Sequence, residues 1–139
     1  MTEHDALIAL NMLPGIGALR LESLLARFEK ASAVLEASID ELESVNGIGS
    51  GLAEKIADWK NIVALEKELD LIEKGGVTVI TKLDIEYPAI LKEIYDPPIC
   101  LYVRGVLPDL NNASLAIVGS RRMSSYGRKC ACHFAQSAA

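Results

Sequence analysis

A five-residue pattern occurs twice in the first half of this 139-residue chain. Leu13-Pro14-Gly15-Ile16-Gly17 and Val45-Asn46-Gly47-Ile48-Gly49 share an apolar residue, a turn residue and the run Gly-Ile-Gly, and they lie 32 residues apart. Each copy lies between stretches in which apolar residues recur every three or four positions, as they do along one face of an α-helix. The repeat therefore predicts two similar helical hairpins and an all-helical first half.

The repeated turn resembles the hairpin of tandem helix-hairpin-helix modules, which are also called SAM-like. In such a hairpin two glycines, here Gly15 and Gly17 and then Gly47 and Gly49, allow a tight turn, and the isoleucine between them packs into the helix pair. Free N–H groups at the start of the next helix are then able to hold a phosphate without reading base sequence. The alternative is a structural hairpin that only joins packed helices.

The charge distribution favours the structural alternative. Residues 1–74 contain seven Lys and Arg against fourteen Asp and Glu, whereas residues 75–139 contain seven against five. The net charge of −5 is therefore the average of an acidic segment and a slightly basic one. Because an acidic surface repels phosphate, we expect the helical half to serve as a scaffold or protein-interaction module, with weak phosphate contact as the lesser possibility.

The residue pattern changes at Gly75-Gly76, where we place the domain boundary. After it, β-branched runs predict strands at 77–81, 99–103 and 115–118, a short helix at 87–94 and a longer helix from Ser124 to the end. A strand, a glycine turn and a helix in succession form the start of a β-α-β unit. We therefore expect α+β content, with a helical module at 1–74 and an incomplete Rossmann-like α/β segment at 75–139.

The strongest chemical signal lies at the end of the third predicted strand. Four cations follow Gly119 within nine residues and without a carboxylate among them, namely Arg121, Arg122, Arg128 and Lys129. In open α/β sheets this position, where a strand ends and a helix begins, binds anions. We predict that phosphate is bound by Gly119, Ser120, Arg121, Arg122, Ser124 and Gly127, and that Tyr126 stacks on a base.

The same turn disfavours a dinucleotide-dependent enzyme. The fingerprint Gly-x-Gly-x-x-Gly is missing, because Ser120 and Arg121 follow the first glycine and the next glycine is Gly127. An arginine in place of the second glycine suits a phosphodiester chain better than a buried dinucleotide. No catalytic Ser-His-Asp or Cys-His pairing and no carboxylate pair lies near the turn. We expect neither catalysis nor a cofactor.

Metal, disulfide and membrane functions are also disfavoured. Cys130, Cys132 and His133 lack the Cys-x-x-Cys spacing of zinc sites, and three cysteines in total do not suggest a disulfide framework. No stretch approaches the ~18 apolar residues of a membrane helix, and the N-terminus is acidic, unlike a secretory signal. We therefore expect a cytoplasmic protein.

Taken together, these blocks resemble the DprA/Smf family of DNA-processing proteins. The resemblance covers the hairpin module at 1–74, then Tyr87-Pro88, Asp96-Pro97-Pro98 and Leu101-Tyr102-Val103-Arg104-Gly105, and finally Ala116-Ile117-Val118-Gly119-Ser120-Arg121 with Ser124 and Tyr126-Gly127. The order and spacing of the blocks are more specific than any block alone.

The resemblance implies an extended Rossmann domain that binds single-stranded DNA in a basic pocket, self-associates and delivers the DNA to RecA recombinase in natural transformation. Gly119, Ser120 and Arg121 match the family's phosphate-contacting turn. The chain ends inside the first Rossmann helix, so we expect a fragment or a truncated product, and self-association is predicted for full-length members rather than for this chain.

Two other functions remain open. One is a nucleotide-processing Rossmann enzyme of the lysine-decarboxylase-like phosphoribohydrolase type, which would need a catalytic Glu and a further glycine motif. The other is an acidic protein-interaction module followed by a linker.

Overall fold

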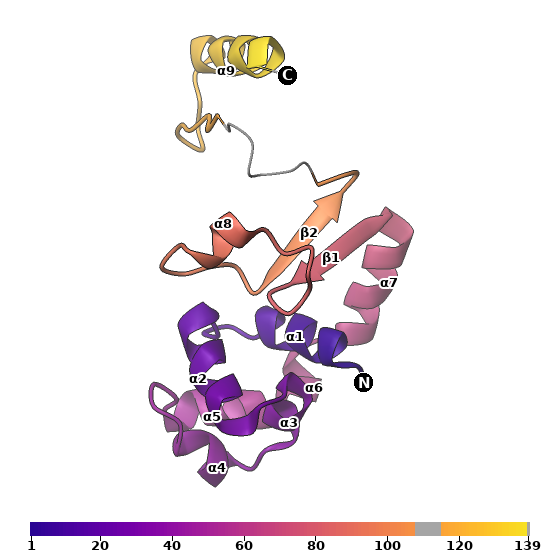
Figure 1. Ribbon diagram of the computed structural model, residues 1–139, viewed down its shortest axis with the longest axis vertical. Coiled ribbons are helices and arrows are strands. Elements are labelled where there is room, and N and C mark those ends of the chain that lie inside the picture. Colours follow the sequence, from indigo (N-terminus) through magenta and orange to yellow (C-terminus); the bar gives the residue numbers. More distant parts are fainter. Residues whose placement is uncertain (108–114, 139) are drawn as a thin grey trace. The chain divides into compact units, whose positions relative to one another are not determined.

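The computed structural model describes residues 1–107 and 115–138 (Figure 1). The chain divides into two compact units, Met1–Pro108 and Asp109–Ala139, and each is described by itself. The elements of the first unit are α1 (Glu3–Met12), α2 (Ala18–Phe28), α3 (Ala31–Glu36), α4 (Ile39–Glu43), α5 (Ser50–Ala57), α6 (Trp59–Ile62), α7 (Leu65–Gly75), β1 (Val77–Thr81), α8 (Ala89–Lys92) and β2 (Cys100–Arg104). The described part of the second unit contains α9 (Ser125–Ala138).

The two copies of the repeat adopt the same backbone conformation. Gly15 and Gly47 have φ values of +101° and +86°, a region that residues with a Cβ rarely occupy. Gly17 and Gly49 are both extended, and each immediately precedes a helix, α2 in the first hairpin and α5 in the second. The predicted tandem helix-hairpin-helix module is confirmed.

The isoleucine of each hairpin packs into a common apolar core. Ile16 is 8% exposed and Ile48 is 4% exposed. The core also takes in Leu21 and Leu24 from α2 and Ile56 from α5, all nearly inaccessible to solvent. Burial of side chains of this size stabilises a fold by about 1.5–3 kcal/mol each, so the hairpins are held by packing on both sides of each turn.

Helix α1 is buried on every face. The run from Ala6 to Leu10 is at most 1% exposed at each position. A surface helix buries one stripe and leaves the opposite face polar, so a helix buried all round needs cover on every side. Here α3 contacts α1 from the helical bundle, and β2 and α7 contact it as well (Figure 1). The central position of α1 therefore joins the bundle to the strands.

Strands β1 and β2 form an antiparallel pair. Their register runs from Val77 opposite Arg104 to Thr81 opposite Cys100. The strands predicted at 77–81 and 99–103 are confirmed to within one residue, whereas the helix predicted at 87–94 is reduced to the single turn of α8.

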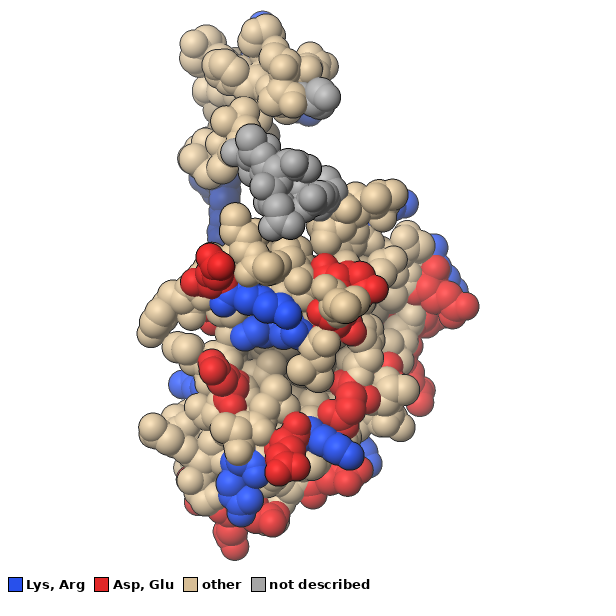
Figure 2. Space-filling model, in the orientation of Figure 1, with Lys and Arg blue, Asp and Glu red and all other residues tan. Residues whose placement is uncertain are grey.

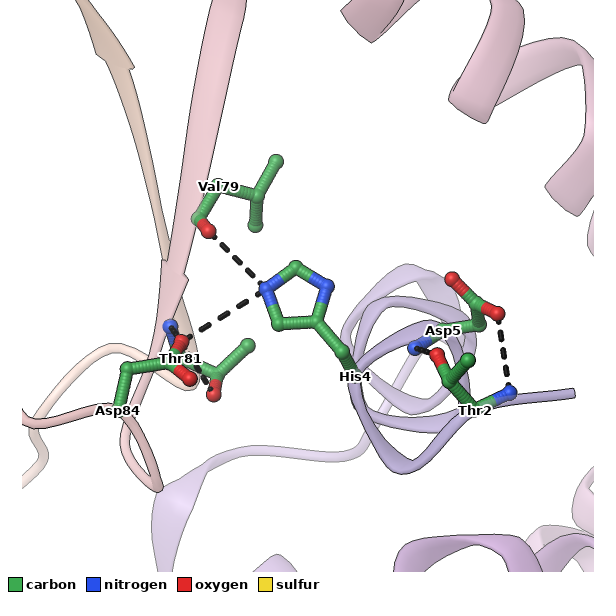
Figure 3. Close-up of polar contacts among 6 residues, drawn as sticks. All are labelled: Thr2, His4, Asp5, Val79, Thr81 and Asp84. Atoms are coloured by element: carbon green, nitrogen blue, oxygen red, sulfur yellow. Dashed lines mark hydrogen bonds and ion pairs between the residues drawn. The ribbon is translucent and has the colours of Figure 1, made fainter.

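The boundary that we placed at Gly75-Gly76 does not separate compact units in the structure. Val79, Ile99 and Cys100 belong to the same apolar core as the helices. Figure 3 shows His4 of α1 reaching across to β1, where its Nε2 lies 3.0 Å from the carbonyl oxygen of Val79. Because α1 needs cover on its outer side, the strands after the glycine pair fold against the helical module and share its core.

The second unit differs from the prediction in one respect. The strand predicted at 115–118 is not formed: residues 115–120 have no regular secondary structure, and Leu115 and Val118 are 66% and 90% exposed. An apolar strand of the parallel type needs neighbours on both edges and cover on both faces, and the described residues of this unit supply only α9. The helix predicted from Ser124 is confirmed as α9. In neither described range is any helix long and apolar enough to cross a membrane.

A side-chain turn closes the end of β1. Thr81, which is 1% exposed, donates from its N–H and from its hydroxyl to Oδ2 of Asp84, at 2.6 and 2.9 Å (Figure 3). His4 Nε2 lies 3.6 Å from the same oxygen. Partial burial acts to raise the pKa of Asp84, but the Thr81 hydrogen bonds and the nearby His4 outweigh it and hold this pKa below its ordinary value of 3.8.

The hairpin geometry predicts opposite effects for two glycine substitutions. Gly47→Ala should lower the free energy of unfolding by about 1–2 kcal/mol, because its positive φ is costly for a residue with a Cβ even though no atom lies within 4 Å of that Cβ. Gly51→Ala, in open space within α5, should raise it by about 0.5 kcal/mol. Urea denaturation followed by the fluorescence of the single, buried Trp59 measures both, and equal effects of the two substitutions would contradict the geometry.

The Asp84 turn predicts a pH-dependent difference between two proteins. Asp84→Asn should reduce the free energy of unfolding by about 1 kcal/mol at neutral pH, because Thr81 loses a charged acceptor. A carboxyl whose folded pKa is lowered stabilises the fold above its unfolded pKa and loses that contribution as the pH falls through the folded value. The difference in free energy of unfolding between wild type and Asp84→Asn should therefore shrink as the pH falls below about 4. If the difference in free energy of unfolding between the two proteins does not shrink between about pH 5 and pH 2, this role for the carboxylate is ruled out.

Candidate nucleic-acid interface

The described part of the second unit is cationic throughout. Residues 115–138 contain Arg121, Arg122, Arg128 and Lys129 and no Asp or Glu, and all four cationic side chains are exposed. Figure 2 shows a different pattern over the first unit, where Asp and Glu side chains are spread among Lys and Arg on the face in view. A polyanion therefore meets uncompensated positive charge at the second unit and mixed charge at the first.

A hollow of about 350 Å³ lies at the start of α9. Its lining includes four of the residues that we predicted to hold phosphate, Gly119, Ser120, Ser124 and Gly127, together with apolar side chains from both sides of the turn. No atom lies within 4 Å of the position that a Cβ on Gly119 would take. The turn thus leaves open space beside its backbone, large enough for a phosphate group.

Ser124, which precedes α9, lines this hollow. Ser124 Oγ accepts a hydrogen bond from the N–H of Gly127 at 3.1 Å, and the Ser124 carbonyl oxygen accepts one from Arg128 at 3.0 Å. Ser124 therefore caps the N-terminus of α9. The N–H groups of a helix's first turn have no partner within the helix, and together with the helix dipole they favour an anion at this end.

The remaining predicted residues lie beside the hollow. Arg121 and Arg122 form an exposed bend before α9, and Tyr126 is 76% exposed on its first turn. Ser120 donates its hydroxyl hydrogen to the carbonyl oxygen of Arg122 at 2.9 Å. The Ser120 hydroxyl thus stabilises the bend, and its hydrogen is not available to a ligand. The exposed guanidinium groups of Arg121 and Arg122 are the side-chain donors at the surface of the bend.

The two helical hairpins differ in what contacts them. In the first hairpin, Ala18 N–H donates to Oδ1 of Asp96 at 3.3 Å, and Arg20 donates to the carbonyl oxygens of Gly15 and Gly47 at 2.6 and 3.2 Å. In the second hairpin, no atom lies within 4 Å of a Cβ built on Gly47 or Gly49. Both hairpins are predictable from the sequence, whereas the role of Asp96 is not, because no local pattern signals a contact between residues 78 positions apart.

The cysteines and histidines do not form a cluster in the described residues. Cys100 lies in the core, where burial raises its pKa to about 12, so it remains a protonated thiol at neutral pH. Cys130 and Cys132 are in α9, and His4 contacts β1 in the other unit. Across residues 1–107 and 115–138 no three His, Cys, Asp or Glu side chains are arranged to hold a metal ion.

Two family models match the chain, one in each half. Residues 7–58 match the SAM-like helix-hairpin-helix tandem, and residues 78–139 match DNA recombination-mediator protein A. The second match begins just after the change of residue pattern at Gly75-Gly76, although the compact unit of the structure continues past it.

Two Smf proteins are similar to this chain. Protein Smf of Borreliella burgdorferi is 40% identical over 70 residues, which are 50% of this chain and 21% of that protein. Protein Smf of Synechocystis is 27% identical over 132 residues, 92% of this chain and 33% of that protein. The chain thus spans about a third or less of the Smf proteins that it matches.

The chain has relatives of a second kind. UvrABC system protein C of Paramagnetospirillum magneticum is 50% identical over 50 residues, which are 36% of this chain and 8% of that protein. No solved structure gives a significant match to the chain. The match to UvrABC system protein C is short, whereas the match to Smf of Synechocystis extends over nearly the whole chain. With a helix-hairpin-helix segment followed by a recombination-mediator segment, the chain is similar to the DprA/Smf family of DNA-processing proteins.

Proposed function

We propose that this chain contacts single-stranded DNA through the turn before α9, as part of a DNA-processing protein that protects incoming DNA and presents it to RecA recombinase during natural transformation in the cytoplasm. The family match over residues 78–139 supports a role in DNA recombination. The observation that carries the DNA contact is the hollow at Gly119, with four exposed cations and no carboxylate in residues 115–138.

The proposed contact is electrostatic and independent of base sequence. Arg121 and Arg122 lie before the positive end of α9, and Arg128 and Lys129 lie within its first turns. Charged donors and first-turn N–H groups both favour phosphate oxygens over base edges. Tyr126, exposed beside these cations, is placed to stack on a base without selecting which base.

In this proposal the chain binds and does not catalyse. Residues 115–138 contain no Asp or Glu that would serve as the catalytic acid or base of a nucleotide-processing Rossmann enzyme. Self-association and RecA delivery are proposed for the full-length protein, because the Smf relatives extend well beyond the region that this chain matches.

Substitution of Arg121 tests the proposed contact. Arg121→Ala should weaken binding of a homopyrimidine oligonucleotide about three- to tenfold at moderate salt, which corresponds to at most about 1.4 kcal/mol. The slope of log affinity against log salt should flatten by about 0.7, the value for one lost single-strand phosphate contact. Fluorescence anisotropy of a labelled oligonucleotide at several salt concentrations measures both quantities.

Two control variants separate a specific contact from a general charge effect. Lys67→Ala removes an exposed cation from α7 in the other unit and should leave affinity and slope nearly unchanged. Arg121→Lys keeps the charge and should restore most of the salt slope but only part of the affinity. Equal losses in Arg121→Ala and Lys67→Ala would refute the proposed contact, and tight binding of a mononucleotide would favour the enzyme.

A further inference from the structure

The first hairpin carries a carboxylate at the position where a helix-hairpin-helix turn holds an anion. Asp96 Oδ1 accepts the N–H of Ala18, the first residue of α2, and lies 3.7 Å from the place of a Cβ on Gly17. Gly17 has no side chain to cap α2. The first-turn N–H group is therefore satisfied by a residue 78 positions away instead of by solvent or a ligand.

The backbone on either side of Asp96 is firmly held. Pro97 is buried, and Ile99 is 3% exposed in the core. The hydroxyl of Tyr87, itself 3% exposed, donates to the carbonyl oxygen of Pro98 at 2.7 Å. The two prolines also fix their own φ angles. Asp96 is thus presented to α2 by a preorganised segment, and the contact costs little further conformational entropy.

The second hairpin provides a comparison within the same molecule. It has the same backbone conformation, and α5, like α2, has no side-chain cap from its own N-cap glycine and no acidic residue in its first turn. Nothing lies within 4 Å of a Cβ on Gly47 or Gly49. The carboxylate is therefore not required by the hairpin conformation itself, and its presence at the first hairpin alone needs another explanation.

The cation beside the first hairpin is also engaged internally. Arg20 Nη1 donates to the carbonyl oxygen of Gly15 at 2.6 Å, and Nε donates to that of Gly47 at 3.2 Å. Because two of its N–H groups donate to these carbonyl oxygens, the Arg20 guanidinium links the two hairpins and has fewer N–H donors available for a phosphate.

We propose that Asp96 is an internal latch that occupies the anion position of the first hairpin, clamps the segment leading into β2 onto α2 and keeps backbone phosphate out of this hairpin. The latch is independent of whether the second unit binds DNA. Because the Asp96 side chain is exposed, water and salt compete with the contact, and an anion gains access only when the carboxylate is displaced or neutralised.

Amide NMR of the whole chain tests both parts of this proposal. Without added anion, Asp96→Asn should shift the Ala18 amide resonance and speed its hydrogen exchange about three- to tenfold, as expected for loss of one charged hydrogen bond. On titration with inorganic phosphate at neutral pH, the Ala18 amide should stay fixed in the wild type and move in Asp96→Asn.

A matched control removes a charge from the same segment without touching the hairpin. Glu93→Gln, at the end of α8, should behave as the wild type in all three measurements. The proposal fails if the wild-type Ala18 amide responds to phosphate as Asp96→Asn does, if it responds in neither protein, or if Asp96→Asn leaves its shift and exchange rate unchanged. Even if the variant is poorly folded, a phosphate-dependent shift of the Ala18 amide in the wild type would by itself overturn the latch.

Discussion

The first unit depends on the burial of α1 on all sides. Five consecutive residues of this helix, Ala6 to Leu10, have almost no contact with solvent, and a helix of that kind is stable only when other elements cover its whole circumference. The helical bundle supplies one part of the cover, and β2 and α7 supply another. The helix-hairpin-helix module and the first strands of the recombination-mediator segment are consequently one folded body.

This coupling gives the two hairpins different surroundings. They have the same turn conformation, and the isoleucine of each packs in the shared core. The first hairpin, however, contacts the segment that leads into β2. Asp96 accepts the N–H of Ala18, and Arg20 donates to the carbonyl oxygens of Gly15 and Gly47. We propose that the first hairpin, a type of motif able to bind phosphate, has a structural role here because the Asp96 carboxylate occupies its anion position. The open, cationic turn before α9 is then the better candidate for contact with a polyanion.

Much of this organisation was predictable from local patterns. The Gly-Ile-Gly repeat predicted both hairpins, the periodic apolar residues predicted the helices, and the β-branched runs predicted β1 and β2. The helix beginning at Ser124 was predictable because helix capping depends on residues that are neighbours in sequence. Four of the residues predicted to bind phosphate around Gly119 line one hollow, and their binding role stays a prediction.

Long-range packing accounts for what the sequence did not predict. The apolar run at 115–118 has strand propensity, but propensity does not produce a strand where the described residues offer no partner. The glycine pair at 75–76 was interpreted as a boundary, yet the cover that α1 needs comes from residues beyond it. Asp96 reads locally as a turn residue, and only the folded chain brings it to Ala18.

We propose that DNA contacts the turn before α9 and not the first hairpin. The most direct measurement is a map of amide chemical-shift changes when an unlabelled homopyrimidine oligonucleotide is added to the whole chain. We expect the largest changes within residues 119–129 and no change at residues 15–20. Changes concentrated at residues 15–20, with residues 119–129 silent, would contradict it.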